Sequence, residues 1–253
     1  MRFRFQAFAL HLLGSASALA LVLGGLYLGW YRWPGWYLTG ALQVAPILVG
    51  VDLVLGPLLT FLIANPAKPR RELARDIGVI VAVQLAALGY GAHTLWAGRP
   101  LYYAFSVDRL QIVQASDLSA QEIALARRSN PAFAPYWHSL PRWVWAPLPD
   151  APAERARIIA SAQAGGDDVI DMPRYFRSWD SGLGVLRGQL RPVAQQQDIR
   201  LYRKQALLAL RMRQRGFVPD QAATLILTGR SAPLLAVFDP AAVRVRAFLR
   251  ADQ

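Results

Sequence analysis

One carboxylate and two prolines lie inside a long apolar run, and their types and spacing have the clearest chemical potential in this 253-residue chain. Asp52 stands between Pro46 and Pro57 in the apolar run of residues 38–64. An acid at the centre of a spanning helix costs roughly 2.5 to 3.5 kcal/mol, so such acids usually face a helix bundle or a partner. Pro57 removes a backbone donor, which predicts a kink near the acid. We expect any functional site to be held here.

Three apolar segments, residues 5–31, 38–64 and 77–97, each reach the roughly 20 residues that a membrane-spanning helix needs. The first could instead be a signal peptide, with Ala18-Leu19-Ala20 as a cleavage site. Its apolar run continues to Trp30, beyond the roughly 7 to 15 residues of a signal peptide's apolar core. The pattern therefore favours three spans.

Charge divides the chain into two parts. Residues 1–98 contain seven Lys and Arg and three acids, whereas residues 99–253 contain 21 basic and 13 acidic residues, as expected of a water-exposed domain. The boundary falls near Pro100, which prevents the third helix from continuing. We expect a transmembrane region at 1–98 and a domain at 99–253 whose short linker holds it against the membrane.

The flanking charges predict the orientation. Arg2 and Arg4 precede the first span and four basic residues lie in the 65–76 loop, whereas the loop after the first span holds only Arg32. The positive-inside rule then places the N-terminus in the cytoplasm and the 99–253 domain across the membrane, which in a bacterium means the periplasm.

The 99–253 domain has a mixed α+β pattern. We expect strand-like runs at 101–107 and 109–113, and helices at 119–128, 151–164 and 198–215. Ser119 and Glu122 form a capping-box pattern. Runs at 223–228, 233–238 and 243–249 predict a C-terminal antiparallel β-meander. The expected fold class is an α-helical membrane bundle of three transmembrane helices followed by this extracytoplasmic α+β domain.

Motifs for other chemistry are weak. The chain has no cysteine, so thiol nucleophiles, disulfides and thiolate metal sites are excluded. The three histidines lack metal-ligand spacing, and His11 and His93, near opposite membrane faces, are not expected to meet. Residues 182–188 depart from a dinucleotide loop and are expected to form an ordinary loop, and Asp167-Asp168 a solvated turn. We expect no metal, cofactor, small-molecule substrate or nucleic acid.

The 198–216 helix can align its basic residues on one stripe and its apolar residues on another. The basic stripe consists of Arg200, Lys204, Arg211 and Arg215, and the apolar stripe of Leu201, Leu208 and Met212. This pattern is typical of a solvated face over a core, and it also suits a surface for anionic lipid headgroups or an acidic partner.

Polar residues within the spans permit two interpretations. They are Gln43, Asp52, Thr60, Gln84 and Thr94. In the first interpretation, Gln43, Asp52 and Gln84 bond one another across the bundle. In the second, Asp52 accepts a hydrogen bond or an ion pair from the transmembrane helix of another protein, and Gly50 and Gly56 permit its close approach.

Several short blocks of the sequence together resemble the type IV pilin accessory proteins of the TfpX/TfpZ family. They are His11-Leu12-Leu13, Gly50-Val51-Asp52, Leu55-Gly56-Pro57-Leu58-Leu59-Thr60, Asn65-Pro66, Gln84 with Tyr90-Gly91, Gly98-Arg99-Pro100 and Val107-Asp108-Arg109. The likeness extends over most of the chain and is densest at residues 8–115.

This resemblance implies a non-enzymatic protein of the bacterial inner membrane that assists type IV pilus biogenesis by engaging the major pilin, both its transmembrane helix and its periplasmic head. The residues expected to contact the partner are Asp52, Gly56, Pro57, Thr60, Gln84, Arg99, Asp108 and Arg109. The alternative is a membrane-anchored enzyme that modifies pilin, such as a transferase, with paired acids among Asp167, Asp168 and Asp171. A small-molecule sensor is a third class, but the sequence shows no cytoplasmic output domain.

Overall fold

The computed structural model describes residues 1–196 and 204–251 and divides the chain into two compact units. Unit 1 comprises Met1–Trp36 and Gly40–Gly98, and unit 2 comprises Tyr37–Thr39 and Arg99–Gln253. The short segment Tyr37–Thr39, from the link between the first two spans, therefore belongs with the second part of the chain. The sequence contains no signal that these three residues belong to unit 2.

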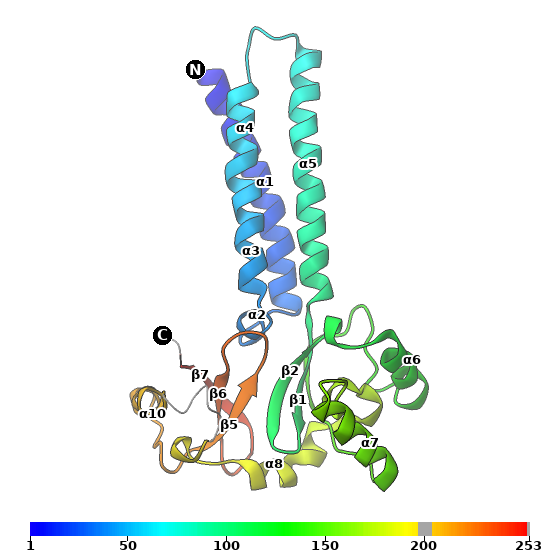
Figure 1. Ribbon diagram of the computed structural model, residues 1–253. Coiled ribbons are helices and arrows are strands. Elements are labelled where there is room, and N and C mark those ends of the chain that lie inside the picture. Colours follow the sequence, from blue (N-terminus) through cyan, green and yellow to red (C-terminus); the bar gives the residue numbers. More distant parts are fainter. Residues whose placement is uncertain (197–203, 252–253) are drawn as a thin grey trace. The chain divides into compact units, whose positions relative to one another are not determined.

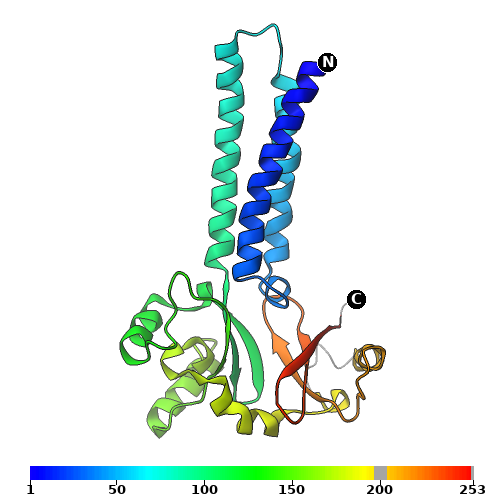
Figure 2. The same ribbon diagram turned by 180° about the vertical axis from the view of Figure 1, so that it is seen from behind.

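Unit 1 is a bundle of three helical spans that lie side by side (Figures 1 and 2). They are α1 (Arg2–Gly29), the continuous run of α3 (Ala41–Gly50), the π-helix η1 (Val51–Leu55) and α4 (Gly56–Ile63), and α5 (Arg70–Ala97). Each is long and apolar enough to cross a membrane, which confirms the expectation of three such helices. The short helix α2 (Gly35–Leu38) lies in the link between the first two.

Unit 2 is built on one seven-stranded sheet in the described part of the chain, with the order β4-β3-β1-β2-β5-β6-β7. The strands are β1 (Pro100–Ser106), β2 (Arg109–Gln114), β3 (Arg142–Trp145), β4 (Arg177–Ser178), β5 (Ala223–Thr228), β6 (Leu234–Phe238) and β7 (Val245–Arg250). The runs predicted at 101–107 and 109–113 form β1 and β2, which pair antiparallel, and the predicted C-terminal antiparallel meander is confirmed. β3 was not predicted, and it pairs in parallel with β1.

One face of this sheet is covered from two ends. The helices of unit 2 are α6 (Ala120–Ser129), α7 (Pro152–Gln163), α8 (Leu183–Gln189) and α10 (Gln205–Gln214). The first core lies under β1 and β3 and includes Tyr102, Val144 and Phe176, and the second places Leu208 and Met212 of α10 against β5, β6 and β7. Figures 1 and 2 show α6 and α10 at the two ends. Short 3-10 turns connect these elements at Ala115–Asp117, Val169–Asp171, Pro173–Tyr175, Trp179–Gly182 and Val193–Gln195.

The opposite face of the sheet is apolar and concave. Phe105, Leu110, Leu227 and Leu234 follow one another across four strands and are almost fully buried. The Trp143 ring of β3 stacks on the Phe248 ring of β7 with centroids 6.3 Å apart, although four strands separate them in the sheet order. The sheet must therefore curl strongly about this face.

Leu38 is fixed to the sheet unit by backbone hydrogen bonds. Its side chain is fully buried, and its carbonyl accepts from the N–H groups of Arg230 and Ser231 at 2.8 and 3.2 Å. Gly229 makes this approach possible, because a Cβ there would lie 2.6 Å from the Leu38 carbonyl oxygen. The second span consequently begins at Ala41, three residues after the predicted start.

Two expectations for unit 2 need correction. Residues 182–188 are not a loop, since Leu183–Gln189 form α8. Gly182 itself is required by packing, because a Cβ there would lie 2.5 Å from Cγ of Trp145. The predicted helix at 198–215 is described only as Gln205–Gln214, and its first residues, with Arg200 and Leu201, lie outside the described residues.

Candidate functional site in the helical unit

The second span is not a regular α-helix where it carries Asp52. Residues Val51–Leu55 form a π-helical turn, in which the N–H of Gly56 donates to the carbonyl of Val51, five residues back. Pro57 lacks the N–H that an α-helix would use at the next position, which favours such a break. The disturbance expected from Pro57 therefore takes the form of a π turn that contains Asp52. π turns in α-helices frequently mark functional sites.

A polar cluster joins all three spans next to this turn. The His11 imidazole contacts Thr60 Oγ1 through Nδ1 at 2.6 Å and Gln84 Oε1 through Nε2 at 2.5 Å. Gln84 in turn donates from Nε2 to the backbone carbonyl of Asp52 at 3.3 Å. An amide oxygen only accepts, so Nε2 of His11 carries the proton and Nδ1 accepts from the Thr60 hydroxyl when the ring is neutral.

The carboxylate of Asp52 is the least satisfied member of the cluster. Asp52 is only 3% exposed, and its Oδ2 atom has no hydrogen-bond partner among the described residues. No described Lys or Arg forms an ion pair with it. A buried oxygen without a donor is unfavourable by about 1 to 3 kcal/mol, which makes this atom a candidate for contact with something outside the chain.

A cavity of about 600 Å³ opens on this cluster. Its walls come from α1, the π turn with α4, and α5, and they are mostly apolar, with Leu10 and Leu85 among them. Asp52, His11, Thr60 and Gln84 supply its polar side. An apolar hollow with a few convergent polar groups is the usual form of a binding site, and this one suits an apolar segment that carries a donor.

Gly56 and Pro57 support the cluster from within the chain. Gly56 is buried against Gln84, and a Cβ there would lie 1.9 Å from Gln84 Nε2. The room that Gly56 leaves is thus filled by Gln84 and is not open to another helix, contrary to the expectation. Pro57 is buried at the start of α4. At Gly50, no atom of the described residues lies within 4 Å of a Cβ position, so this position remains open in the described part of the chain.

The first of the two interpretations, in which Gln43, Asp52 and Gln84 bond one another, does not hold for Gln43. That residue is exposed, and Thr94 bonds locally to the Tyr90 carbonyl at 2.9 Å. His11 takes the place expected of Gln43. The available signal was a lone imidazole in an otherwise apolar helix, since polar groups in hydrocarbon tend to find partners. The bonds of His11 to α4 and α5 were not predicted.

The remaining predicted site residues lie in unit 2 and do not form one cluster. Arg99 is 5% exposed and donates from Nη2 to the Tyr136 carbonyl at 3.4 Å. Asp108 is exposed in the turn between β1 and β2. Arg109 forms an ion pair with Asp168, so that acid is engaged and not merely solvated as expected.

The acids named for the enzyme alternative have structural contacts. Asp168 caps the turn Val169–Asp171, with its side chain accepting from the N–H of Val169 at 2.6 Å, and Asp171 accepts from the N–H of Asp168 at 3.2 Å. Burial, together with the charges of Asp117 and Asp167, raises the pKa of Asp171 to about 6. No group of three potential metal ligands occurs among the described residues.

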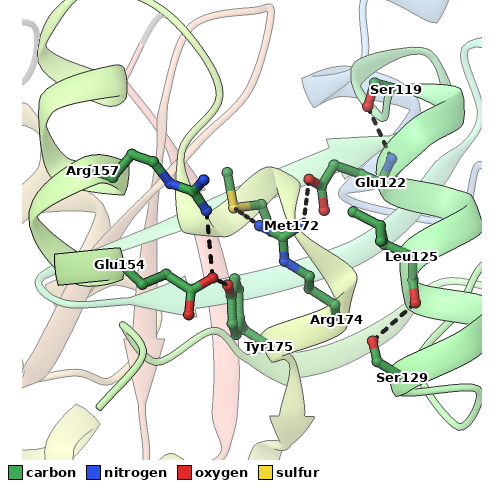
Figure 3. A network of polar contacts seen from close by, with 9 residues as sticks. All are labelled: Ser119, Glu122, Leu125, Ser129, Glu154, Arg157, Met172, Arg174 and Tyr175. Atoms are coloured by element: carbon green, nitrogen blue, oxygen red, sulfur yellow. Dashed lines mark hydrogen bonds and ion pairs between the residues drawn. The ribbon is translucent and has the colours of Figure 1, made fainter. Parts of the chain in front are cut away.

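A second buried carboxylate, Glu122 of α6, lies in unit 2 (Figure 3). Ser119 is the N-cap of α6, as predicted, and its Oγ accepts from the backbone N–H of Glu122 at 3.1 Å. The Glu122 side chain does not return a bond to Ser119, so the capping box is not completed. Instead, Glu122 Oε1 accepts from Arg174 Nη1 at 2.7 Å. Burial raises the pKa of Glu122, and the Arg174 charge opposes that shift. Figure 3 also shows the neighbouring contacts among Tyr175, Glu154 and Arg157.

The basic residues described at the end of α10 act within unit 2. Arg211 donates to the carbonyl of Arg250, and Arg215 Nη1 donates to the carbonyl of Phe248 at 3.3 Å. Both acceptors belong to β7. Leu208 and Met212 are buried, as the helical spacing predicted. These contacts favour the interpretation of a basic face over a core.

Comparison with known proteins finds relatives along most of the chain. It is 28% identical over 223 residues to the fimbrial assembly protein of serogroup I from Dichelobacter nodosus, covering 83% of this chain and 84% of that protein. It is 28% identical over 234 residues to the serogroup E1 protein of the same organism, covering 87% and 85%. It is 32% identical over 127 residues to the protein of serogroups C1 and C2, covering 49% and 97%. No family model matches the chain, and no solved structure matches it.

Proposed function

We propose that this chain, which belongs to the family of fimbrial assembly proteins and has a role in type IV pilus biogenesis, acts by engaging the major pilin in the membrane. Within that family we assign it to the TfpX/TfpZ type of pilin accessory protein, on the sequence blocks around Asp52 and Arg99 that resemble that type.

The observation that carries the proposal is the open oxygen of Asp52 in an apolar cavity. Oδ2 of Asp52 lacks a donor among the residues that the structure describes, and the cavity beside it has walls from all three spans. A transmembrane helix that brings a hydroxyl, an amide or a cation to this depth would satisfy the acid and cover the apolar wall together. Neither contact needs to be strong, because two linked contacts raise the effective concentration of each other.

We propose a second contact in unit 2, with the pilin head. Asp108 in the β1–β2 turn is exposed and Arg109 beside it is half exposed, so this turn is the part of the expected set that is accessible. Arg99 is buried and is better suited to hold the neighbouring loop than to contact a partner.

The proposed topology places the N-terminus and the loop after α4 in the cytoplasm, and unit 2 in the periplasm of a bacterium with an inner membrane. Lys68, Arg70 and Arg71 support it, because the basic residues of short loops set orientation. Lys68 contacts Glu72 and Asp76 at 3.3 and 2.8 Å, but acids contribute little to this rule.

The proposed role is non-enzymatic, a pilin chaperone or assembly factor. Support comes from the acids of unit 2, since Asp168 and Asp171 are used in a cap and an ion pair. The mass of mature pilin should be the same in cells with and without this protein. A mass difference would favour the transferase alternative.

Site-specific photocrosslinking tests the pilin contact. A crosslinking amino acid replaces Leu10 or Leu85, which line the cavity and are 72% and 58% exposed. Matched controls replace Leu21 and Val79, which are 78% and 60% exposed but do not line it. In cells that make both proteins, pilin should be captured from positions 10 and 85 well above positions 21 and 79. Equal capture at all four positions, or none, would refute the contact.

A further inference from the structure

A rigid turn in unit 2 presents aromatic and apolar side chains to the outside. Tyr136, Trp137 and Leu140 are 39%, 71% and 60% exposed. The N–H of Tyr136 donates to Ser139 Oγ at 2.9 Å, and the N–H of Ser139 donates back to the Tyr136 carbonyl at 3.1 Å. Trp137 and His138 therefore occupy the tip of a closed turn, with their rings in contact at 5.1 Å. We call residues 136–140 the aromatic turn.

The base of the aromatic turn is fixed in the core. Ala134 and Pro135 are buried, the Tyr102 hydroxyl donates to the Phe133 carbonyl at 2.6 Å, and Arg142 donates to the Ala132 carbonyl at 2.7 Å. A loop anchored in this way keeps its tip exposed and cannot simply fold its tryptophan inward. An exposed tryptophan on a rigid support is typical of a binding surface.

Chain connectivity keeps the aromatic turn near the membrane surface. The Tyr136 carbonyl accepts from Arg99, and Arg99 is bonded to Gly98, the residue that follows the α5 span. Arg99 is two residues from Ala97, at most about 7.6 Å along the backbone. Whatever the orientation of unit 2, one arginine side chain and two peptide units separate the turn from the end of a span.

The charge around the aromatic turn is positive. Residues 123–149 contain Arg127, Arg128 and Arg142 and no acid. Arg127 lies over the Tyr136 ring at 5.4 Å, and neither Arg127 nor Arg128 pairs with a carboxylate in the described part of the chain. Tryptophan and tyrosine prefer the membrane interface, and arginines near the surface are attracted to anionic lipids.

We propose that the aromatic turn is a membrane-interface anchor, in which Trp137 and Leu140 enter the headgroup layer and Arg127 and Arg128 hold the phosphates of anionic lipids. Unit 2 would then be fixed to the bilayer by this surface as well as by the chain. The inference does not depend on the proposed pilin contact, because its ligand is the lipid of the membrane that the spans enter.

Spin labelling of the full chain in nanodiscs tests the anchor without pilin. The natural chain has no cysteine, so Leu140→Cys carries a single nitroxide beside an intact Trp137, and Val185→Cys and Val218→Cys serve as exposed controls in the same unit. In nanodiscs of phosphatidylglycerol and phosphatidylcholine in equal parts, the ratio of oxygen to nickel-complex collisions should be several-fold higher at 140 than at 185 and 218. A ratio at 140 equal to the controls would overturn the proposal.

Two further variants separate the contributions of ring and charge. Trp137→Ser should bring the ratio at 140 down to that of the controls while the melting temperature of unit 2 stays unchanged. Arg127→Gln with Arg128→Gln should lower the ratio in the anionic nanodiscs and leave it unchanged in pure phosphatidylcholine. An unchanged ratio in Trp137→Ser would contradict the anchor, and so would burial at 140 that develops only after pilin is added, since that would identify a protein surface.

Discussion

Each of the two units buries a carboxylate, and the two acids differ in whether the described chain supplies an ion-pair partner. Glu122 in the sheet unit is 7% exposed and has a guanidinium partner at 2.7 Å. Asp52 in the helical unit is 3% exposed, and no described Lys or Arg forms an ion pair with it. Each acid also has one oxygen without a hydrogen-bond partner among the described residues, Oδ2 of Asp52 and Oε2 of Glu122, so the ion pair is what separates them. A buried acid whose charge is paired within the chain serves the fold. An open acid beside a cavity serves the fold poorly, which favours a role in contact with another molecule.

The surroundings reinforce this difference. Glu122 joins α6 to the segment of Arg174, where Asn130 also donates to the carbonyls of Pro173 and Phe176 at 3.1 and 2.9 Å. The chain thus supplies the charge partner of Glu122 and fixes the segment that carries it. Around Asp52, the chain places His11, Thr60 and Gln84 at the wall of a cavity of about 600 Å³. In one region the charge of the buried acid is paired within the chain, and in the other the buried acid and its polar neighbours line a cavity.

The largest expected effect on stability comes from breaking the ion pair between Glu122 and Arg174. Arg174→Met leaves Glu122 buried and unpaired, which should lower the free energy of unfolding of unit 2 by about 3 to 5 kcal/mol. The double variant Glu122→Leu with Arg174→Met should recover most of that loss. Thermal unfolding of the purified chain measures both. A single variant as stable as the parent would show that the pair does not hold the fold.

A smaller effect concerns Asp171 and pH. Its folded pKa of about 6 lies above the ordinary value of 3.8, so the native state binds this proton more tightly than the unfolded state does. The contribution of Asp171 to stability is therefore full below about pH 4 and is lost as the pH rises through 6, by at most about 3 kcal/mol.

Replacing Asp171 tests this directly. Asp171→Asn keeps an oxygen for the Asp168 N–H and should raise the unfolding temperature at pH 8 but hardly at pH 4. Unfolding midpoints of the parent and the variant across this range give the difference, in which titrations of groups that do not interact with Asp171 cancel. A difference that is constant with pH would contradict the raised pKa.

Substitution of Gly56 tests the polar cluster around Asp52 and Gln84. Gly56→Ala places a methyl group 1.9 Å from Gln84 Nε2, so Gln84 must move and give up its bonds to His11 and to the Asp52 carbonyl. We expect a loss of about 1 to 2 kcal/mol, the size of interhelical hydrogen bonds in membranes. Unfolding of unit 1 in detergent measures it. Gly50→Ala, which meets no neighbour, is the matched control and should change nothing. Equal losses for both glycines would mean that Gln84 is not constrained as described.

The smallest expected effect on stability belongs to Asp52 itself. Asp52→Asn leaves the backbone carbonyl that Gln84 uses and removes a charge that lacks a described ion-pair partner. The unfolding free energy of unit 1 should change by less than about 1 kcal/mol, since hydrogen bonds within membranes are worth little more. The same detergent unfolding measures it. A large loss would place Asp52 with Glu122 as a residue of the fold.

Local sequence patterns predicted the elements of the fold that depend on contacts between residues close together in the chain. The meander of β5, β6 and β7 follows from alternating apolar runs separated by turn residues, and Ser119 caps α6 as its spacing predicts. The parallel strand β3 was missed because its four residues depend on pairing with β1, some forty positions earlier. A short run near prolines contains no local signal for such a pairing.

The candidate site was predictable in part for the same reason. Asp52, Thr60 and Gln84 were identified because each is a polar residue in an apolar run, and the structure brings them together. His11 belongs to the same class, but its partners lie on two other helices, and only the bundle geometry selects it over Gln43. The loss of Leu38 from the second span likewise depends on its burial in a sheet formed much later in the chain.

The most direct test of the difference between the two acids is the number of surface pili on cells that carry one altered acid at a time. Cells with Asp52→Leu should make the protein at the parental level in the membrane and lose most of their pili. Cells with Glu122→Leu and Arg174→Met should keep them. Normal piliation with Asp52→Leu at an equal protein level would contradict the account, whatever the double variant does.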